Sequence, residues 1–69
     1  MTPVAELVSN KRILVIDDML ATGGTARAAR HMVVRMGGKV VEFAFFLEIS
    51  SMNGRGKLAP TRVFSLLQY

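Results

Sequence analysis

Cysteine is absent from this 69-residue sequence, and histidine occurs only once. The sequence therefore excludes disulfides and cysteine-rich zinc sites, and a single histidine is too few for a histidine-based metal cluster. No apolar run approaches the roughly 18 residues of a membrane-spanning helix, so no membrane partner is expected. The first residues lack a basic stretch followed by an apolar core, which argues against a signal peptide and favours a cytoplasmic protein.

The small size of the chain limits the core that it can build. Hydrophobic residues make up 51% of the sequence, yet a domain this short buries only about 60% of the surface of its unfolded chain. We therefore expect apolar surface that a partner covers, with the five methionines in the core or at an interface. The net charge is +4, but the basic residues are scattered without interleaved aromatic residues, so no nucleic-acid partner is expected.

Two apolar runs predict parallel strands. Residues 12–16 and 39–47 show no strict alternation, which is typical of strands that are covered on both faces of a parallel sheet. We expect Phe43, Phe45 and Phe46 to pack in this sheet. A polar loop leads to a last short apolar run, residues 63–67, which is expected at the sheet edge.

The segment between the first two runs predicts a helix. Apolar side chains at helical spacing form one stripe, and Gly37-Gly38 is the expected C-terminal stop. Thr22 or Thr25 is the expected N-cap. The stripe consists of Ala29, Met32, Val33 and Met36. Strand, helix and strand together predict an α/β fold: a βαβ unit with a right-handed crossover, followed by a final short strand.

An acidic pair and a glycine-rich turn separate the first strand from this helix. In open α/β sheets, ligands bind beyond the carboxyl ends of the strands, where this turn lies. Gly23-Gly24 lets the backbone approach an anion closely, and the N–H groups at the helix start favour a phosphate. The hydroxyl groups of Thr22 and Thr25 add donors. The turn therefore predicts a phosphate site.

Asp17 and Asp18 indicate what accompanies the phosphate. Carboxylates repel a phosphate, but they accept hydrogen bonds from the paired hydroxyls of a ribose or from water on a magnesium ion. A Walker loop is excluded because no lysine follows Gly24, and the GxGxxG dinucleotide fingerprint is absent. Ordinary turn chemistry is the alternative for either feature alone. Both features in one run favour a ligand that carries a phosphate and a sugar diol.

These residues resemble a known family. Residues 15–25 are similar to the phosphoribosyl pyrophosphate signature of type I phosphoribosyltransferases, and residues 20–25 most resemble the adenine phosphoribosyltransferase family. Residues 54–58, Gly-Arg-Gly-Lys-Leu, resemble that family's Gly-Arg-x-Lys-Leu segment, and residues 64–69 resemble its carboxyl-terminal strand. The resemblance implies that residues 12–69 are the carboxyl-terminal portion of a Rossmann-like phosphoribosyltransferase domain.

The resemblance also implies an activity and its site. The family makes AMP and pyrophosphate from adenine and phosphoribosyl pyrophosphate with Mg²⁺, a purine salvage reaction, and forms homodimers. By position, Asp17 and Asp18 would hold the ribose hydroxyls. The residues that would bind the 5′-phosphate are Ala21, Thr22, Gly23, Gly24 and Thr25. No catalytic residue or protein metal ligand is assigned. The family's amino-terminal part, which supplies the hood that contacts adenine, the pyrophosphate-binding loop and the flexible loop with the catalytic acid, has no counterpart in residues 1–11. We therefore expect the chain alone to be inactive.

Three alternatives remain open beside a truncated adenine enzyme. The loop could serve a binding module without chemistry, a phosphoribosyltransferase for another base, or a pyrophosphokinase. Residues 1–11 are expected to form a short helix or leader, with Ala5 and Val8 facing the sheet. His31 is expected to be solvated rather than a base, and Arg55 and Lys57 to lie in a solvated loop rather than to bind an anion or a partner.

Overall fold

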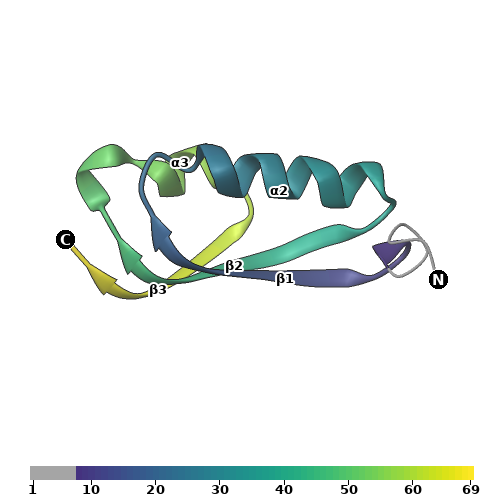
Figure 1. Cartoon of the computed structure of the whole chain (residues 1–69), viewed down its shortest axis with the longest axis horizontal. Helices are drawn as coiled ribbons and strands as arrows, with labels where there is room; N and C mark the ends of the chain where they lie inside the picture. Colours follow the sequence, from purple (N-terminus) through teal and green to yellow (C-terminus); the bar gives the residue numbers. More distant parts are fainter. Residues whose placement is uncertain (1–7) are drawn as a thin grey trace.

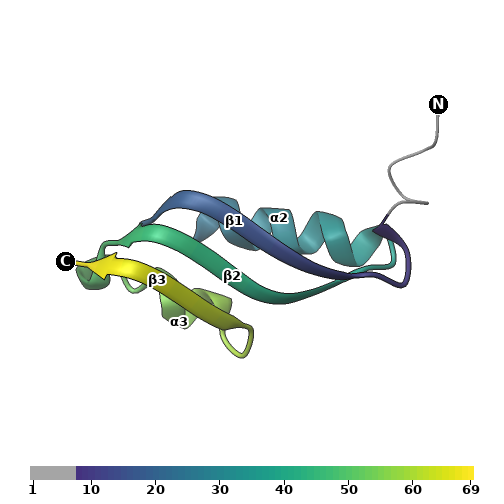
Figure 2. The same cartoon turned by 90° about the horizontal axis from the view of Figure 1, so that it is seen from below.

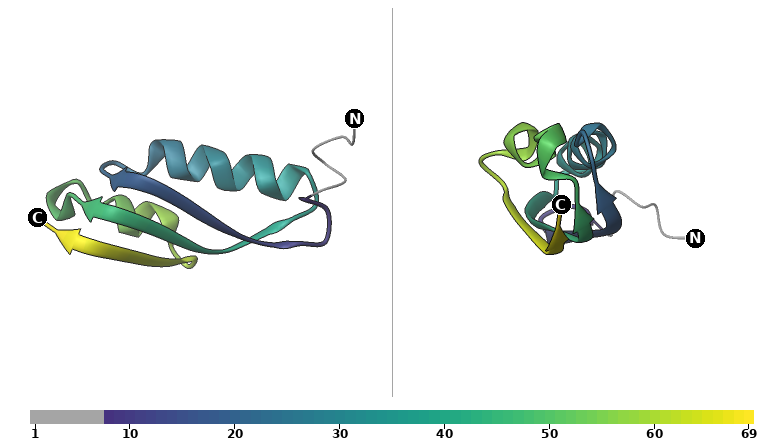
Figure 3. Two further views of the ribbon diagram at one scale, coloured as in Figure 1. Left: turned by 60° about the horizontal axis from the view of Figure 1, so that its bottom comes forward. Right: turned by 90° about the vertical axis from the view of Figure 1, so that its left-hand side faces the viewer.

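The chain folds into three parallel strands with helices on one side. The computed structural model describes residues 8–69, and the strands follow each other in the order β1-β2-β3. Both α-helices lie against the same face of the sheet (Figures 1 and 3). The elements are β1 (Arg12–Leu20), α2 (Gly24–Arg35), β2 (Lys39–Glu48), the 3-10 helix η1 (Ser50–Met52), α3 (Gly54–Leu58) and β3 (Arg62–Gln68). The predicted α/β fold is confirmed, with β3 at the edge.

The strands are longer than their apolar runs. β1 continues beyond the predicted end at residue 16, so the acidic pair belongs to the strand and not to the following loop. Pairing with β2 causes this extension, because the register continues from Asp17 opposite Phe45 to Leu20 opposite Glu48. The expected polar loop at residues 50–57 instead contains η1 and most of α3.

Only one face of the sheet is covered within residues 8–69, so the other face keeps the exposed apolar surface that is expected of so short a chain. The view from below shows the three strands with both α-helices behind them (Figure 2). Phe43 and Phe45 are buried on the helix side, whereas Phe46 is 58% exposed, because neighbouring strand residues point to opposite faces. Packing of Phe46 was therefore wrongly predicted. The core consists of Leu20, Ala26, Val40, Phe43, Phe45 and Leu58.

Helix α2 begins differently from the prediction and ends as predicted. Its N-cap is Gly23 at φ 87°, and no side chain makes a capping hydrogen bond, so the expectation that Thr22 or Thr25 caps the helix is wrong. The left-handed conformation of Gly23 turns the backbone into the helix and leaves both threonines exposed. At the other end, Gly37 takes φ 85° just after the last helical turn.

The face of α2 that meets the sheet is shifted from the predicted stripe. Ala26 is buried and Val33 packs against the core, but Met32 is 61% exposed. Met19 and Met52 are also close to half exposed, at 49% and 45%. These three methionines are therefore not core residues, which corrects that part of the expectation.

The helix or leader predicted for residues 1–11 lies mostly outside the described residues. The prediction for Ala5 also lies outside them. Val8 is half-buried and lies close to Gly38. Asn10 donates a backbone hydrogen bond of 2.9 Å to Gly37, which ties this segment to the turn after α2. Among residues 8–69, no helix has the length and hydrophobicity to cross a membrane.

Candidate functional site

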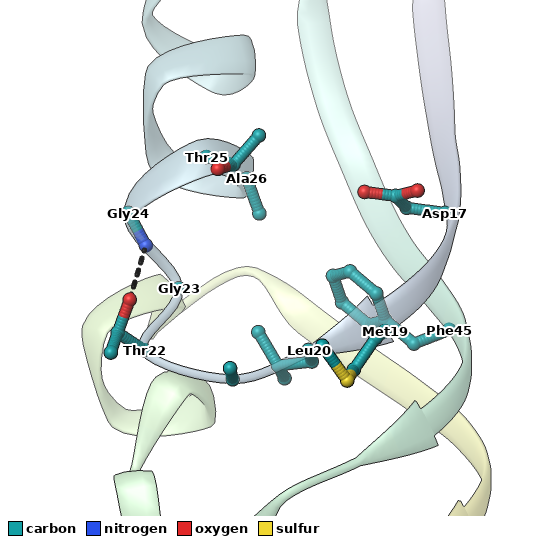
Figure 4. A pocket seen from close by; sticks show the side chains of 10 residues that line it. Asp17, Met19, Leu20, Thr22, Gly23, Gly24, Thr25, Ala26 and Phe45 are labelled. Atoms are coloured by element: carbon teal, nitrogen blue, oxygen red, sulfur yellow. Dashed lines mark hydrogen bonds between the residues drawn. The ribbon is translucent and has the colours of Figure 1, made fainter.

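A hollow of about 170 Å³ opens at the carboxyl end of β1, where the chain turns into α2. Its wall combines β1, the turn and the first residues of the helix with one aromatic ring from β2 (Figure 4). The lining residues are Asp17, Met19, Leu20, Ala21, Thr22, Gly23, Gly24, Thr25, Ala26 and Phe45. The structure thus brings together all five residues predicted to bind the 5′-phosphate.

The start of α2 presents backbone donors to this hollow. The first hydrogen bond of the helix runs from the Arg27 N–H to the Gly23 carbonyl at 2.9 Å. The N–H groups of Gly24, Thr25 and Ala26 precede it and have no partner inside the helix. Gly24 N–H reaches Thr22 Oγ1 only at 3.5 Å, the long limit of a hydrogen bond. These amides, with the helix dipole behind them, can bind an anion.

The two aspartates are placed differently. Both aspartates are exposed. The carboxylate of Asp17 points across the hollow toward the start of α2 (Figure 4), whereas Asp18 does not line the hollow. Asp17 Oδ1 accepts a 2.8 Å hydrogen bond from the backbone N–H of Asp18. Successive side chains of a strand point to opposite faces, which explains the separation. The predicted role of Asp18 at the ribose would therefore need a contact from outside this wall.

An ion pair between the exposed Arg55 and the buried Glu48 lies beside the site, and the sequence reasoning missed it. The Arg55 guanidinium contacts Glu48 through Nη2–Oε1 at 2.7 Å and Nε–Oε2 at 3.2 Å. Glu48 is only 4% exposed. The hydrogen bond from Arg55 lowers the pKa of Glu48 below its ordinary value of 4.5, although burial acts in the opposite direction. Glu48 in turn raises the pKa of Arg55.

The expectation that Arg55 lies in a solvated loop is wrong in part, because Arg55 belongs to α3 and pairs with Glu48, although its side chain stays 44% exposed. A buried carboxylate requires a positive partner, and the fold of residues 49–58 supplies one. Lys57, two residues further on, is exposed as expected. The signal in the sequence that could have identified the pair was Glu48, an acidic residue directly after the apolar run of residues 39–47.

Arg30, on α2, is half-buried. Its Nη1 donates to the Leu58 carbonyl at 2.7 Å and to Thr61 Oγ1 at 2.9 Å, so it joins α2 to the end of α3. His31 is exposed, as expected. Within residues 8–69, no group of three or more side chains of the kinds that ligate metals comes together.

The sequence was compared with known families and proteins. A family model described as "Phosphoribosyl transferase domain" matches residues 1–67, and thus includes the N-terminal segment that the sequence analysis left outside the resemblance. The adenine phosphoribosyltransferase of Chloroflexus aurantiacus is 52% identical over 58 residues, which are 84% of this chain and 34% of that protein. The chain spans about a third of the length of the curated relatives that it matches.

Solved structures show the same fold. The adenine phosphoribosyltransferase of Thermoanaerobacter pseudethanolicus superposes with a TM-score of 0.86 at 36% identity, covering 88% of this chain and 36% of that one. The Trypanosoma brucei adenine phosphoribosyl transferase, solved with AMP, pyrophosphate and ribose-5-phosphate, superposes with a TM-score of 0.77 at 30% identity. It covers 86% of this chain and 29% of that one.

Proposed function

Because the chain belongs to the phosphoribosyl transferase domain family, we propose that it binds the 5-phosphoribosyl group of phosphoribosyl pyrophosphate as part of an adenine phosphoribosyltransferase. One observation carries this proposal: a carboxylate and the amides of a helix start face each other across one hollow. A ligand that fits must present an anion at one end and hydroxyl groups at the other. Ribose 5-phosphate has this chemistry.

The proposed positions follow from the donors and acceptors in the hollow. The phosphate lies at the helix start, where Gly24 has no side chain and Thr22 and Thr25 add hydroxyl donors. Asp17 accepts hydrogen bonds from the ribose hydroxyls. Asp18, on the other face of the strand, is proposed to act at the ribose only together with a part of the domain beyond this wall.

The reaction proposed for the complete site transfers the phosphoribosyl group to adenine. A nitrogen of adenine bonds to the anomeric carbon and gives up its proton, the bond from that carbon to the pyrophosphate oxygen breaks, and the products are AMP, pyrophosphate and the released proton. The protein positions the reactants and stabilises the charge of an oxocarbenium-like state. The part of this chain in that task is to hold the phosphate and to orient the sugar. This reaction belongs to purine salvage.

Magnesium is proposed to enter with the substrate. Magnesium sites in enzymes that act on phosphates use one or two carboxylates plus the phosphates of the substrate. Asp17 is the carboxylate of the hollow that fits such a role, by accepting a hydrogen bond from water on the ion. The ion would neutralise charge on the departing pyrophosphate.

The size of the hollow separates two candidate functions. Its 170 Å³ is smaller than the roughly 300–1,000 Å³ of pockets that enclose whole ligands. The hollow suits the sugar phosphate better than the sugar phosphate together with adenine and pyrophosphate. A binding module without chemistry is therefore the second candidate for the 69-residue chain. We expect it to form little or no AMP from adenine and phosphoribosyl pyrophosphate, and robust AMP formation would rule this candidate out.

Titration calorimetry with ribose 5-phosphate tests the proposed site. We expect binding to the wild-type chain, no binding of unphosphorylated ribose, and no binding of ribose 5-phosphate to the double variant Asp17→Ala/Gly24→Val. The Met32→Ala variant, changed at an exposed site on α2, is the matched control and should bind as the wild type does. Unchanged affinity in the double variant would remove this hollow from the site.

A homodimer in the cytoplasm completes the proposal. The exposed apolar side chains on the open face of the sheet support a partner subunit. The cytoplasm suits phosphorylated substrates, because their charges oppose passage through a membrane.

A further inference from the structure

The phosphate loop, residues 21–24, rests on the backbone of α3. A Cβ added at Gly23 would lie 2.9 Å from the Gly54 carbonyl oxygen, and one added at Gly54 would overlap the carbonyl oxygen of Ala21. Neither position therefore has room for a side chain. The conformation of the loop consequently depends on where α3 begins.

Arg55, the next residue, fixes the start of α3 on the sheet. Besides its two contacts with Glu48, its Nη1 donates to the Val63 carbonyl at 2.7 Å and its Nη2 to Ser65 Oγ at 3.2 Å. Ser65 Oγ also donates to Glu48 Oε1. One guanidinium thus joins α3 to both β2 and β3.

The anchoring point lies in the same row of the sheet as the start of the loop. Glu48 is paired with Leu20, the last residue of β1 before the loop. The Ile49 N–H donates to the Leu20 carbonyl at 2.8 Å. The loop therefore leaves the sheet beside Glu48, the residue that holds Arg55. The end of β1 and the start of α3 are thus fixed to the same part of the sheet.

We propose that Arg55 is a positioning residue for the phosphate loop, acting through Glu48 and the backbone of Gly54. The inference rests on the proposed function, because it assigns the loop a ligand. None of Arg55, Glu48 and Ser65 lines the hollow, so their effect on the ligand is indirect. Glu48 is buried while the Arg55 side chain stays 44% exposed, and the two parallel contacts between them fix the direction of the guanidinium. Backbone donors bind an anion well only when they are held in place.

The variant Arg55→Met tests this role, with Arg35→Met as the matched control. Both variants remove one positive charge from the chain, but Arg35 lies in the last turn of α2, far from the loop. We expect Arg55→Met to weaken ribose 5-phosphate binding roughly tenfold, as a small displacement of binding groups does. Arg35→Met should bind as the wild type does. Arg55→Lys keeps the charge without the planar fork, so it should recover only part of the affinity.

Amide hydrogen exchange in the free protein separates positioning from general destabilisation. We expect Arg55→Met to speed exchange at the amides that hold the two ends of the loop, Ile49 on the Leu20 carbonyl and Arg27 on the Gly23 carbonyl. The amides of Phe43 and Phe45 in the core should keep their protection. Equal acceleration at loop and core, or unchanged loop exchange, would overturn the proposal. So would equal loss of affinity in Arg35→Met.

Two further outcomes are also decisive. If Arg55→Met does not fold, Arg55→Lys carries the same comparison: faster exchange confined to the loop supports the proposal, and exchange as in the wild type overturns it. If the wild-type chain does not bind ribose 5-phosphate, the proposed function fails, and loop exchange alone then decides whether Arg55 positions the loop.

Discussion

Two adjacent glycines in the phosphate loop meet different requirements. Gly23 is needed by the fold, because it combines φ 87° with close approach to the Gly54 carbonyl. Gly24 has open space around its Cα, since the nearest atom to an added Cβ is Thr22 Oγ1 at 3.7 Å. A side chain there would extend from the residue that faces the ligand.

We therefore expect one alanine variant to lose stability and the other to lose affinity. Gly23→Ala should lower the free energy of unfolding by about 1–3 kcal/mol, the cost of a left-handed non-glycine residue. Gly24→Ala should leave the urea midpoint close to that of the wild type and weaken ribose 5-phosphate binding. Urea unfolding and calorimetry on both variants check this, and a stability loss in Gly24→Ala as large as that in Gly23→Ala would contradict it.

Glu48 predicts how stability changes with acid. Because Arg55 lowers the pKa of this carboxyl in the folded chain, the folded state binds its proton less readily than the unfolded state does. The resulting stabilisation is present above the ordinary value of 4.5 and is lost as the pH falls through the lower folded value.

The variant Glu48→Gln should therefore lose stability at neutral pH and show a weaker loss on acidification. Urea midpoints measured from about pH 7 to about pH 3 for this variant and the wild type check the expectation. Glu42→Gln is the control, because it removes a carboxylate that has no contact with Arg55 or Ser65 among the described hydrogen bonds. Parallel acid profiles of the wild type and Glu48→Gln would contradict the assignment.

At the scale of elements, α2 and α3 are joined by Arg30. Its side chain reaches the Leu58 carbonyl and Thr61 from the neighbouring helix. We expect Arg30→Met to lower the free energy of unfolding by about 1–3 kcal/mol, because it removes two hydrogen bonds from a charged donor, while the Leu58 carbonyl keeps the Thr61 N–H at 2.9 Å. Arg27→Met, at an exposed site one turn earlier, should change it by less than about 0.5 kcal/mol. Equal urea midpoints for these two variants would refute the link.

The sequence was sufficient for the three strands and α2, but not for η1 and α3, which form where a polar loop was expected. Apolar runs predicted the strands, and residues 17–25 indicated the candidate site because its chemistry lies within one contiguous stretch. The hydrogen bonds of Arg55 and Arg30 were not predicted, because each joins residues that come close together only in the assembled fold. Arg55 meets Ser65 only after β3 pairs with β2, and Arg30 faces α3 only after both helices pack on the same side.

At the scale of the whole molecule, the sheet has an uncovered apolar face within the described residues. Ile16 pairs with Ala44 and Ala44 with Phe64, so these side chains lie in one row across the strands. Ile16 is 72% exposed and Phe64 53%. Three apolar neighbours, Leu14, Phe46 and Leu66, extend this row into a patch. We call this patch the open sheet face.

An open apolar face of this kind should bind a hydrophobic dye and promote association. We expect sedimentation velocity to show concentration-dependent assembly of the wild-type chain. The double variant Ile16→Thr/Phe64→Thr should reduce both assembly and dye binding, while threonine preserves strand propensity. Met32→Thr, on the exposed side of α2, is the control. Undiminished assembly in the double variant would show that another surface is responsible.

The anchoring of Arg55 on β3 also sets the order in which the protein matures. During synthesis, the phosphate loop is made before the residues that hold its support, since residues 21–24 precede Val63 and Ser65 in the chain. A nascent chain that has completed α2 therefore carries the whole loop but lacks the contacts that hold α3 in place. In the proposed function, phosphate binding thus follows the addition of β3 to the sheet.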